Sequence, residues 1–514
     1  MGSGASSACV AAAVDAATAD ELESTFRGMS PENKERLRRA LTKTDAPAKT
    51  LAALCQIHGV PGSMNCMGPI LLALTAGCGE MKQCMPFSDT TKPEFLAINP
   101  FHTVPALKDG EFCLGESSAI LRYMARKYAP ETYSTDPVTA GFIDWAMDRF
   151  TLSMYKDAAA TIYPVLGYAA PPEDKAAAGK TCTENLESFA AHFLKAKFIG
   201  GEKLSIADYQ VAPFFACYQH PALKEKGSVE CPARIQQFNK DFKKACGASG
   251  MLLSAGGYAL VEMLNKAGPE MDVAQFDATV PGDLGTGSNG TAKQPAGKVE
   301  IHGVPGSMNC MGPILLAHAA GCGEMKQCMP FSDTTKPEFL AINPFHAVPA
   351  LKDGEFCLGE SSATLRYMAR KYAPDAYPAD PAKAGFIDWA MDRFATSMYS
   401  DAAATIYPAL GYAAPPEDKA AAGKKCTENL ESFAAHFLKA KFIGGDKPSI
   451  ADYKVAPFFV CYEHPLLKEK SLVECPARIK EFNKDFKEAC GAAGMLEAAG
   501  GYALKEMLDE KAKA

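Results

Sequence analysis

The chain contains one long segment twice, because a shift of 244 positions superimposes residues 57–264 on residues 301–508. Over the first 74 positions of this match, only four residues differ between the copies. A repeat of this length exceeds the roughly 20–45 residues of the units that stack in solenoids. The sequence therefore predicts two whole domains in tandem. Because the copies are so alike, the second adds little independent information about the role of any residue.

Length and composition favour several hydrophobic cores and argue against nucleic-acid binding. The 514 residues, 47% of them hydrophobic, exceed what one core usually holds. The formal net charge of -7 offers no basic field for a phosphate backbone. The 18 cysteines form neither CxxC pairs nor a Cys and His spacing that is typical of zinc sites. We therefore expect reduced thiols, no metal and no nucleic-acid partner.

The N-terminus, which lies outside the repeat, allows two interpretations. Its first residues, MGSGAS, fit the pattern for N-myristoylation of Gly2, and Cys9 would then be a candidate for palmitoylation. The simpler interpretation is a flexible tail of small residues, because one acyl chain anchors only weakly. No signal peptide and no run of 18 apolar residues is found in the sequence. We expect a cytoplasmic protein that associates with membranes only if Gly2 is acylated.

Each copy has two unlike halves. The first half alternates strand and helix patterns in the order βαβ then αββα, with Asp109-Gly110 as a hairpin turn, which favours a small mixed sheet covered by helices. The second half has apolar residues at helical spacing and few strand signals. We predict an N-terminal helical extension (1–50), an α/β subdomain (51–130), a helical subdomain (131–267), a flexible linker (268–298), a second α/β subdomain (299–374) and a second helical subdomain (375–514).

Four motifs in register support a family resemblance. They are VPGSMNC (60–66), KPEFLAINPFHTVPALKDG (92–110), GESSAILRYMARKY (115–128) and FIGGEKLSIADY (198–209). In this order and spacing, each copy resembles a cytosolic glutathione transferase, closest to the delta and theta classes that use a serine. The resemblance covers 208 residues twice. It implies a thioredoxin-like subdomain followed by an all-helical subdomain, with the pair duplicated in tandem.

The chemistry that this resemblance implies is stabilisation of a thiolate. A thiol with a pKa near 8.5 is only a few per cent ionised at neutral pH, and the thiolate is the nucleophile. By resemblance, the hydroxyls of Ser63 and Ser307 donate to the glutathione sulfur beside a helix N-terminus, which offers positive potential. Without the other motifs, Ser63 would be interpreted as part of a Pro-Gly-Ser turn or as a helix cap.

Other residues match the family's glutathione-binding positions. Glu116 suits the ammonium of the tripeptide, and Ser117 at a helix N-terminus suits its α-carboxylate. Pro105 matches the family's cis-proline, the backbone of Val104 would pair with the glutathione backbone, and His102 matches a position near the glycine end. Each of these residues also has a purely structural explanation, because such residues are common at helix starts, at strand starts and on protein surfaces. The equivalents in the second copy are His346, Val348, Pro349, Glu360 and Ser361.

The pocket for the second substrate and the nearby cysteines leave alternatives open. Met154, Tyr155 and Tyr163 are candidates to line a pocket for a small electrophile, although such stripes at helical spacing are ordinarily core. Cys66 and its equivalent Cys310 offer competing thiol-disulfide chemistry. Ser63, however, holds the position that the cysteine has in the omega-type and glutaredoxin-like relatives, so Cys66 is expected to pack as a small apolar side chain.

We therefore expect an enzyme that conjugates glutathione to small electrophiles, with hydroperoxide reduction by the same thiolate. The alternatives are a non-catalytic scaffold of the same fold and a cysteine-dependent thiol transferase. The retained site residues favour the enzyme, whereas the absence of arginines at Ser118 and Met67, where the delta pattern often has them, favours the scaffold. Since the family forms two-fold dimers, the two copies can pair within one chain, or two chains can pair by exchanging halves.

Overall fold

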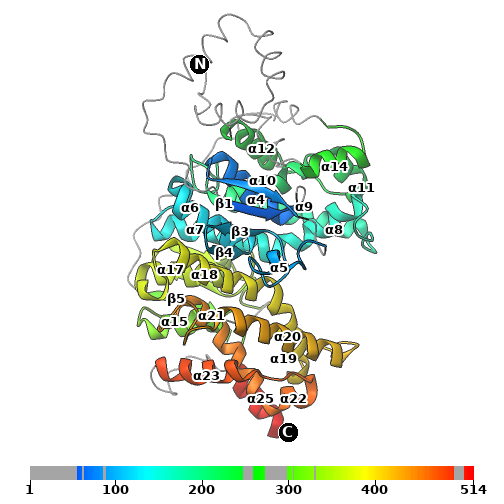
Figure 1. The fold of residues 1–514 in the computed structure, drawn as a ribbon. Coiled ribbons are helices and arrows are strands. Elements are labelled where there is room, and N and C mark those ends of the chain that lie inside the picture. Colours follow the sequence, from blue (N-terminus) through cyan, green and yellow to red (C-terminus); the bar gives the residue numbers. More distant parts are fainter. Residues whose placement is uncertain are drawn as a thin grey trace, which may run out of the picture.

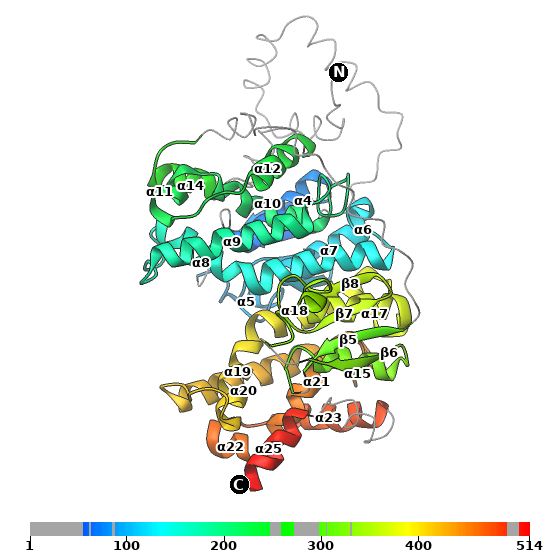
Figure 2. The same cartoon turned by 180° about the vertical axis from the view of Figure 1, so that it is seen from behind.

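The computed structural model describes residues 55–60, 63–84, 88–246, 259–271, 298–304, 306–328, 332–490 and 503–513. Residues 55–271 are called copy one here, and residues 298–513 are called copy two. The copies are stacked, with copy one in the upper half of Figure 1 and copy two in the lower half, and the reverse view in Figure 2 agrees. The helices expected before residue 50, the acylation candidates Gly2 and Cys9, and most of the expected linker lie outside the described residues.

Each copy begins with a four-stranded mixed sheet. The strands of copy one are β1 (Cys55–Gly59), β2 (Gly79–Gln83), β3 (Ala106–Asp109) and β4 (Phe112–Gly115). Their order is β2-β1-β3-β4, with β1 parallel to β2, and with β3 antiparallel to both β1 and β4. The same order and directions recur in copy two, in β5 (Val299–Gly303), β6 (Gly323–Gln327), β7 (Ala350–Asp353) and β8 (Phe356–Gly359). The predicted duplicated thioredoxin-like sheet is confirmed.

Helices cover these sheets and form the second half of each copy. In copy one they are α4 (Met64–Thr75), α5 (Pro93–Leu96), α6 (Ser117–Tyr128), α7 (Pro137–Arg149), α8 (Tyr155–Val165), α9 (Lys175–Phe193), α10 (Ile206–Tyr218), α11 (Pro221–Gly227), α12 (Ala233–Ala245) and α14 (Ala259–Ala267). In copy two they are α15 (Met311–Ala319), α16 (Pro337–Leu340), α17 (Ser361–Tyr372), α18 (Pro381–Arg393), α19 (Tyr399–Leu410), α20 (Lys419–Phe437), α21 (Ile450–Phe459), α22 (Pro465–Ser471), α23 (Ala477–Ala489) and α25 (Ala503–Lys513).

A π-helical turn joins two long helices in each copy. The turn η2 (Phe150–Met154) connects α7 to α8, and η5 (Phe394–Met398) connects α18 to α19. Such turns are rare and occur frequently at functional sites, because the extra residue redirects side chains. Both turns contribute residues to the cavity described below.

A complete capping box begins α10. The Asp208 carboxylate accepts hydrogen bonds from the backbone nitrogen and the hydroxyl of Ser205, both at 2.7 Å, and from the backbone nitrogen of Ile199 at 2.9 Å. These bonds satisfy backbone donors that would otherwise be buried without partners. Burial raises the pKa of Asp208 to about 6, while these donors oppose the shift. The helix that lies at the centre of the copy therefore has a fixed start.

The two copies meet through a buried cluster of charges. Helix α6 packs on α18, and α7 packs on α17. Across this contact, Arg122 pairs with Asp144 of its own copy at 2.7 Å and with Asp392 of copy two at 3.3 Å. Positive and negative groups are equal in number, so their charges balance within the interface. The members of this interface cluster are Arg122, Arg126, Arg366, Arg370, Asp144, Asp148, Asp388 and Asp392.

Each copy also packs one phenylalanine against aromatic residues of the other copy. Phe101 of copy one stacks on Phe437 of copy two at 5.6 Å between ring centroids and meets Trp389 edge-on. The Arg393 guanidinium covers its ring at 4.4 Å. Phe345 of copy two repeats this arrangement against Trp145, Phe193 and Arg149 of copy one. One chain therefore forms an internal pseudo-dimer in this structure, the first of the two pairings expected from the sequence.

Two interface histidines should make stability depend on pH. Burial lowers the pKa of His192 to about 3 and that of His436 to about 4, from an ordinary 6.5. The unfolded chain therefore binds protons that the folded chain excludes once the pH falls below about 6.5. Stability is fully present above that pH, and we expect it to fall by about 1–2 kcal/mol per histidine between pH 7 and pH 5. Denaturant unfolding at both pH values measures this.

The double variant His192→Gln/His436→Gln should lose the part of the stability change between pH 7 and pH 5 that comes from these two histidines. His102→Gln, which removes an exposed imidazole, is the control for the loss of a histidine elsewhere in the chain. Buried carboxyls such as Asp208 are present in all of these proteins, so their contribution cancels in the comparison. An identical loss of stability in the wild type and the double variant would show that the interface histidines do not titrate on unfolding.

Candidate functional site

A cavity of about 690 Å³ lies where copy one meets copy two. Three regions of copy one border it: the start of α4, the segment before β3, and the turn from β4 into α6. Both π-helical turns complete its wall, so the cavity includes residues from both copies. Expected glutathione-binding residues that share it are Val104, Pro105, Glu116 and Ser117.

Ser63 stands at the N-cap of α4. The residue is half-buried, and its side chain makes no capping hydrogen bond, so the hydroxyl is not used to start the helix. The hydroxyl is in hydrogen-bond contact with the Cys66 thiol. Asn65, two residues further along, lines the cavity. The predicted thiolate-stabilising hydroxyl is thus at a helix N-terminus beside the cavity, where the helix dipole favours negative charge.

Copy two has a similar but shorter start to its first helix. Ser307 is half-buried and contacts the Cys310 thiol, as Ser63 contacts Cys66. Residues 308–310 form a turn, and α15 begins only at Met311. The hydroxyl therefore has the same neighbour in both copies but is farther from the helix start in copy two.

Cys66 is fully buried beneath the sheet. Burial raises the pKa of its thiol, and the contact with Ser63 opposes this only in part. A thiolate is required for thiol-disulfide exchange, and buried apolar surroundings disfavour it. This placement weakens the cysteine-dependent alternative.

Glu116 has an unusual backbone and a partner from the other copy. Its φ of 64° is in the left-handed region, which is costly for a non-glycine residue and is often retained at functional sites. The Thr396 hydroxyl of copy two donates to its Oε2 at 3.3 Å. Burial raises the pKa of Glu116 to about 7, and the positive charge of Arg393 opposes the rise. This carboxylate faces the cavity with room for a cationic partner.

A short polar network supports the start of α6. The Gln210 side chain donates from Nε2 to Ser118 Oγ at 3.1 Å and to Thr151 Oγ1 at 2.6 Å. Ser117 is left half-exposed at the cavity. Sequence reasoning missed Gln210, Thr151 and Thr396. No local motif marks them, because they reach the site from the helical subdomain or from the other copy.

The segment that precedes β3 has the predicted turn. The bond between Val104 and Pro105 is cis, and the equivalent bond before Pro349 is cis in copy two. His102 is exposed, and its Nδ1 lies 3.1 Å from the Thr90 carbonyl oxygen. His346 repeats that contact with Thr334 at 3.2 Å. The structure thus places both histidines on short loop contacts at the molecular surface.

The three candidates for the second pocket take different positions. Tyr155 lines the cavity, and its hydroxyl lies 3.4 Å from Asn65 Nδ2 and 3.3 Å from the Tyr163 hydroxyl. Tyr163 is half-buried, and burial raises the pKa of its hydroxyl. Met154 is buried in the core. Tyr155 is therefore the member of this set that reaches the cavity.

In copy two, Glu360 and Ser361 again lie at the turn from β8 into α17. Glu360 has a φ of 63°, and Ser361 is 2% exposed, unlike the half-exposed Ser117. Val348 is half-buried and precedes the buried Pro349. The two sites therefore share a backbone but differ in how accessible this serine is.

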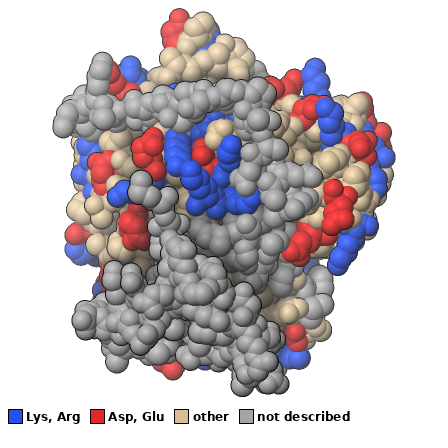
Figure 3. Space-filling view, turned by 90° about the horizontal axis from the view of Figure 1, so that it is seen from above, with Lys and Arg blue, Asp and Glu red and all other residues tan. Residues whose placement is uncertain are grey.

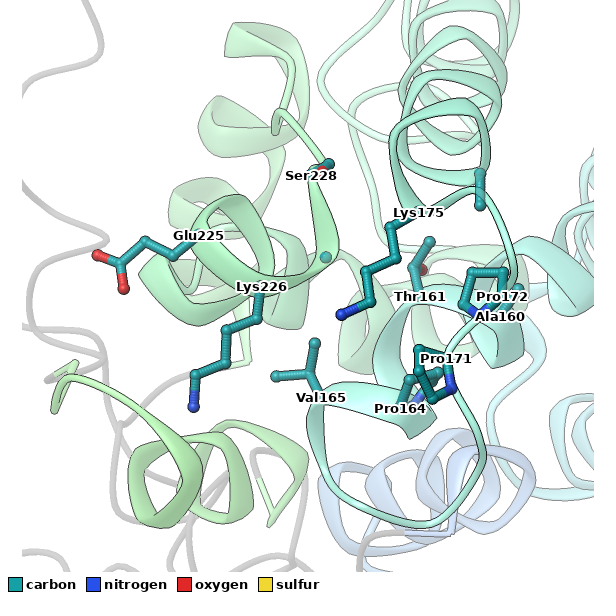
Figure 4. A pocket seen from close by; sticks show the side chains of 12 residues that line it. Ala160, Thr161, Pro164, Val165, Pro171, Pro172, Lys175, Glu225, Lys226 and Ser228 are labelled. Carbon is teal, nitrogen blue, oxygen red and sulfur yellow. The ribbon is translucent and has the colours of Figure 1, made fainter.

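A second hollow, of about 530 Å³, lies on the helical subdomain of copy one (Figure 4). Lys175 from α9, Val165 from α8 and Lys226 from α11 border it. A smaller equivalent of about 360 Å³ occurs in copy two. Both hollows are separate from the serine and glutamate positions discussed above.

The surface seen from above carries acidic and basic side chains interspersed with one another (Figure 3). Within the described ranges, no helix is long and apolar enough to cross a membrane. Among the same residues, no group of three or more His, Cys, Asp or Glu side chains could hold a metal ion. The cysteines that the structure describes are free thiols.

Comparison with known proteins matches both copies to one family model. Residues 80–126 and 301–370 match the glutathione S-transferase N-terminal domain. Glutathione S-transferase F10 of Arabidopsis thaliana is 32% identical over 131 residues, which are 24% of this chain and 61% of the relative. The matched region thus spans less than two thirds of that curated relative.

Similar solved structures align with somewhat less than half of the chain. A delta-class glutathione transferase of Nilaparvata lugens is 26% identical, with a TM-score of 0.35, 41% of this chain covered and 99% of its own. A theta-class enzyme of Xanthomonas axonopodis pv. citri, solved with glutathione bound, is 24% identical, with a TM-score of 0.32, and the match covers 39% of this chain and 99% of its own.

Proposed function

We propose that the chain, which matches the glutathione S-transferase N-terminal domain in both of its copies, activates the thiol of glutathione for conjugation to small electrophiles. The observation that carries the proposal is the cavity between the copies. It brings Val104, Pro105, Glu116 and Ser117 together, and Asn65, two residues after the N-cap residue Ser63, lines the same space.

The two ends of the glutathione backbone would find complementary groups here. Its α-carboxylate suits the Ser117 hydroxyl and the free backbone N–H groups at the start of α6. Its ammonium suits Glu116, and a cationic ligand would return that carboxyl to its charged form. The backbone of Val104 before the cis bond offers hydrogen bonds to the peptide backbone.

The sulfur would then lie at the start of α4. The Ser63 proton can be donated to a thiolate there, and the helix N-terminus adds positive potential. The proton released from glutathione leaves to solvent, and the thiolate forms a carbon–sulfur bond with the electrophile as the leaving group departs with its electron pair. We propose that the same thiolate also attacks organic hydroperoxides. The O–O bond breaks, the alcohol leaves, and the resulting sulfenic acid of glutathione reacts with a second glutathione to give glutathione disulfide and water.

Tyr155 is our candidate contact for the electrophile. It lies on the cavity wall with a hydroxyl available for a polar substrate atom. Arg393 of copy two contributes positive charge near Glu116, which partly offsets the arginines missing from the start of each helix. The pseudo-dimer would thus be needed for a complete site.

Calorimetric titration of glutathione into the full-length protein tests this proposal, with the ultraviolet absorbance of the thiolate recorded in parallel. We expect binding at submillimolar to millimolar concentration and a thiolate signal at neutral pH. Binding without that signal would mean that the protein binds glutathione but does not ionise its thiol. No binding at millimolar glutathione would contradict the enzyme and favour the non-catalytic scaffold.

A further inference from the structure

The two expected glutathione sites differ in their helical wall although their Glu-Ser-Ser segments are identical. Gln210 of copy one corresponds to Lys454 of copy two. Thr151 corresponds to Ala395, and Leu152 corresponds to Thr396. The Thr396 hydroxyl of copy two reaches Glu116 in the copy-one site. Its equivalent in copy one is Leu152, which has no hydroxyl to offer. The duplication therefore left two sites with different polar groups.

In copy one, the residue at this position of the helical wall is Gln210, which is uncharged. Gln210 donates to Ser118 and Thr151, and both of these hydroxyls belong to copy one. Ser117 is therefore free of Gln210 and borders the cavity. Glu116 lines the same cavity and accepts a hydrogen bond from Thr396 of copy two.

In copy two, the wall residue is a buried cation. Lys454 is 3% exposed, and its Nζ donates to Ser361 Oγ, which itself is 2% exposed. The charges that stabilise it are those of Asp148 and Glu360, with Asp392 contributing less. Burial lowers the pKa of Lys454 to about 8, so the ammonium still predominates at neutral pH. Lys454 thus covers the serine and offers a positive charge to the glutamate.

This placement has an electrostatic consequence for ligands. A ligand ammonium that approached Glu360 would come close to the Lys454 ammonium, and like charges repel strongly in a partly buried site. A ligand carboxylate at the start of α17 would instead lie near the Lys454 cation, which already donates to Ser361. The copy-two site therefore suits a group with one negative charge and no positive charge.

We infer that Lys454 supplies, from within the protein, the ammonium that glutathione supplies in copy one. Copy one then binds glutathione, and copy two selects a thiol peptide that ends in a carboxylate without an ammonium. This inference rests on the proposed function, because it assigns the same subsite in both copies. The chain would be an enzyme with two unlike sites.

The test is calorimetric stoichiometry on the full-length chain with two probes, glutathione and its analogue that lacks the α-amino group. The wild type should bind one equivalent of glutathione, and Lys454→Gln, which restores the copy-one residue, should bind two. Gln210→Lys should lose the first equivalent, with affinity lowered about 100-fold. The deaminated analogue should bind to copy two with an affinity that falls about tenfold or more in Lys454→Gln.

Lys447→Gln is the matched control, because its side chain is 77% exposed and it should behave as the wild type. Glutathione binding to copy one of Lys454→Gln, which the substitution does not touch, shows that this variant is folded. Two equal glutathione equivalents in the wild type would overturn the inference and leave the proposed function standing. Failure of every variant to bind glutathione would overturn the proposed function. Lys454-dependent binding of the analogue would then still support the assignment for copy two.

Discussion

Replacing Ser63 by alanine lowers kcat/KM for glutathione conjugation by about 10²- to 10³-fold, which is the usual effect of removing one donor to a developing negative charge. Glutathione affinity should change little, because the contact proposed for the hydroxyl is with the sulfur and not with the charged ends of the tripeptide. The thiolate absorbance of the bound ligand should disappear at neutral pH. The same substitution at Ser307 should have a much smaller effect on glutathione turnover if copy two selects a different ligand.

Steady-state kinetics of Ser63→Ala, Ser307→Ala and the double variant measure this difference. Ser63→Thr is the conservative variant, since it keeps a hydroxyl, and it should recover part of the rate. Ser88→Ala removes an exposed hydroxyl from a loop and should leave the rate unchanged. If Ser63→Ala retained the wild-type rate and the thiolate signal, Ser63 would only shape the turn before α4.

Replacing Arg122 by methionine is expected to destabilise the folded chain by about 3–5 kcal/mol, because it removes one partner from a buried ionic cluster. The side chain is fully buried and pairs with Asp144, Asp148 and Asp392. Nearby arginines lower the pKa of Asp144, so this carboxylate stays ionised at any physiological pH. Loss of Arg122 would leave these carboxylates with too little compensating charge.

Equilibrium unfolding in urea measures this change, with Lys180→Met as the control. The Lys180 side chain is 77% exposed and forms only a helical surface pair, so its loss should change stability by less than about 0.5 kcal/mol. Arg366→Met should reproduce the loss, because Arg366 holds the symmetric place in copy two. A change below about 1 kcal/mol for both arginines would show that the copies do not depend on this cluster for stability.

Much of the fold could be predicted because its determinants are local. Alternating strand and helix patterns, the Asp109-Gly110 turn and the Ser205-Asp208 cap each act over a few residues, and each occurs where the sequence indicated. The boundaries of short elements such as α5 (Pro93–Leu96) are less sharply encoded than the centres of long helices. The motif from Val104 to Ser117 similarly placed the cis bond and the helix start.

The sequence by itself thus determined the duplication, the order of strands and helices, and the segment that carries the expected glutathione-binding residues. Only the tertiary structure decided what surrounds that segment. It brought Thr396 of copy two to Glu116 and set Lys454 against Ser361, contacts across 280 and 93 positions of the chain. The physical reason is that burial and charge compensation depend on which side chains share a cavity. Local periodicity fixes the elements, whereas the packing of two copies against each other fixes the electrostatics of the site.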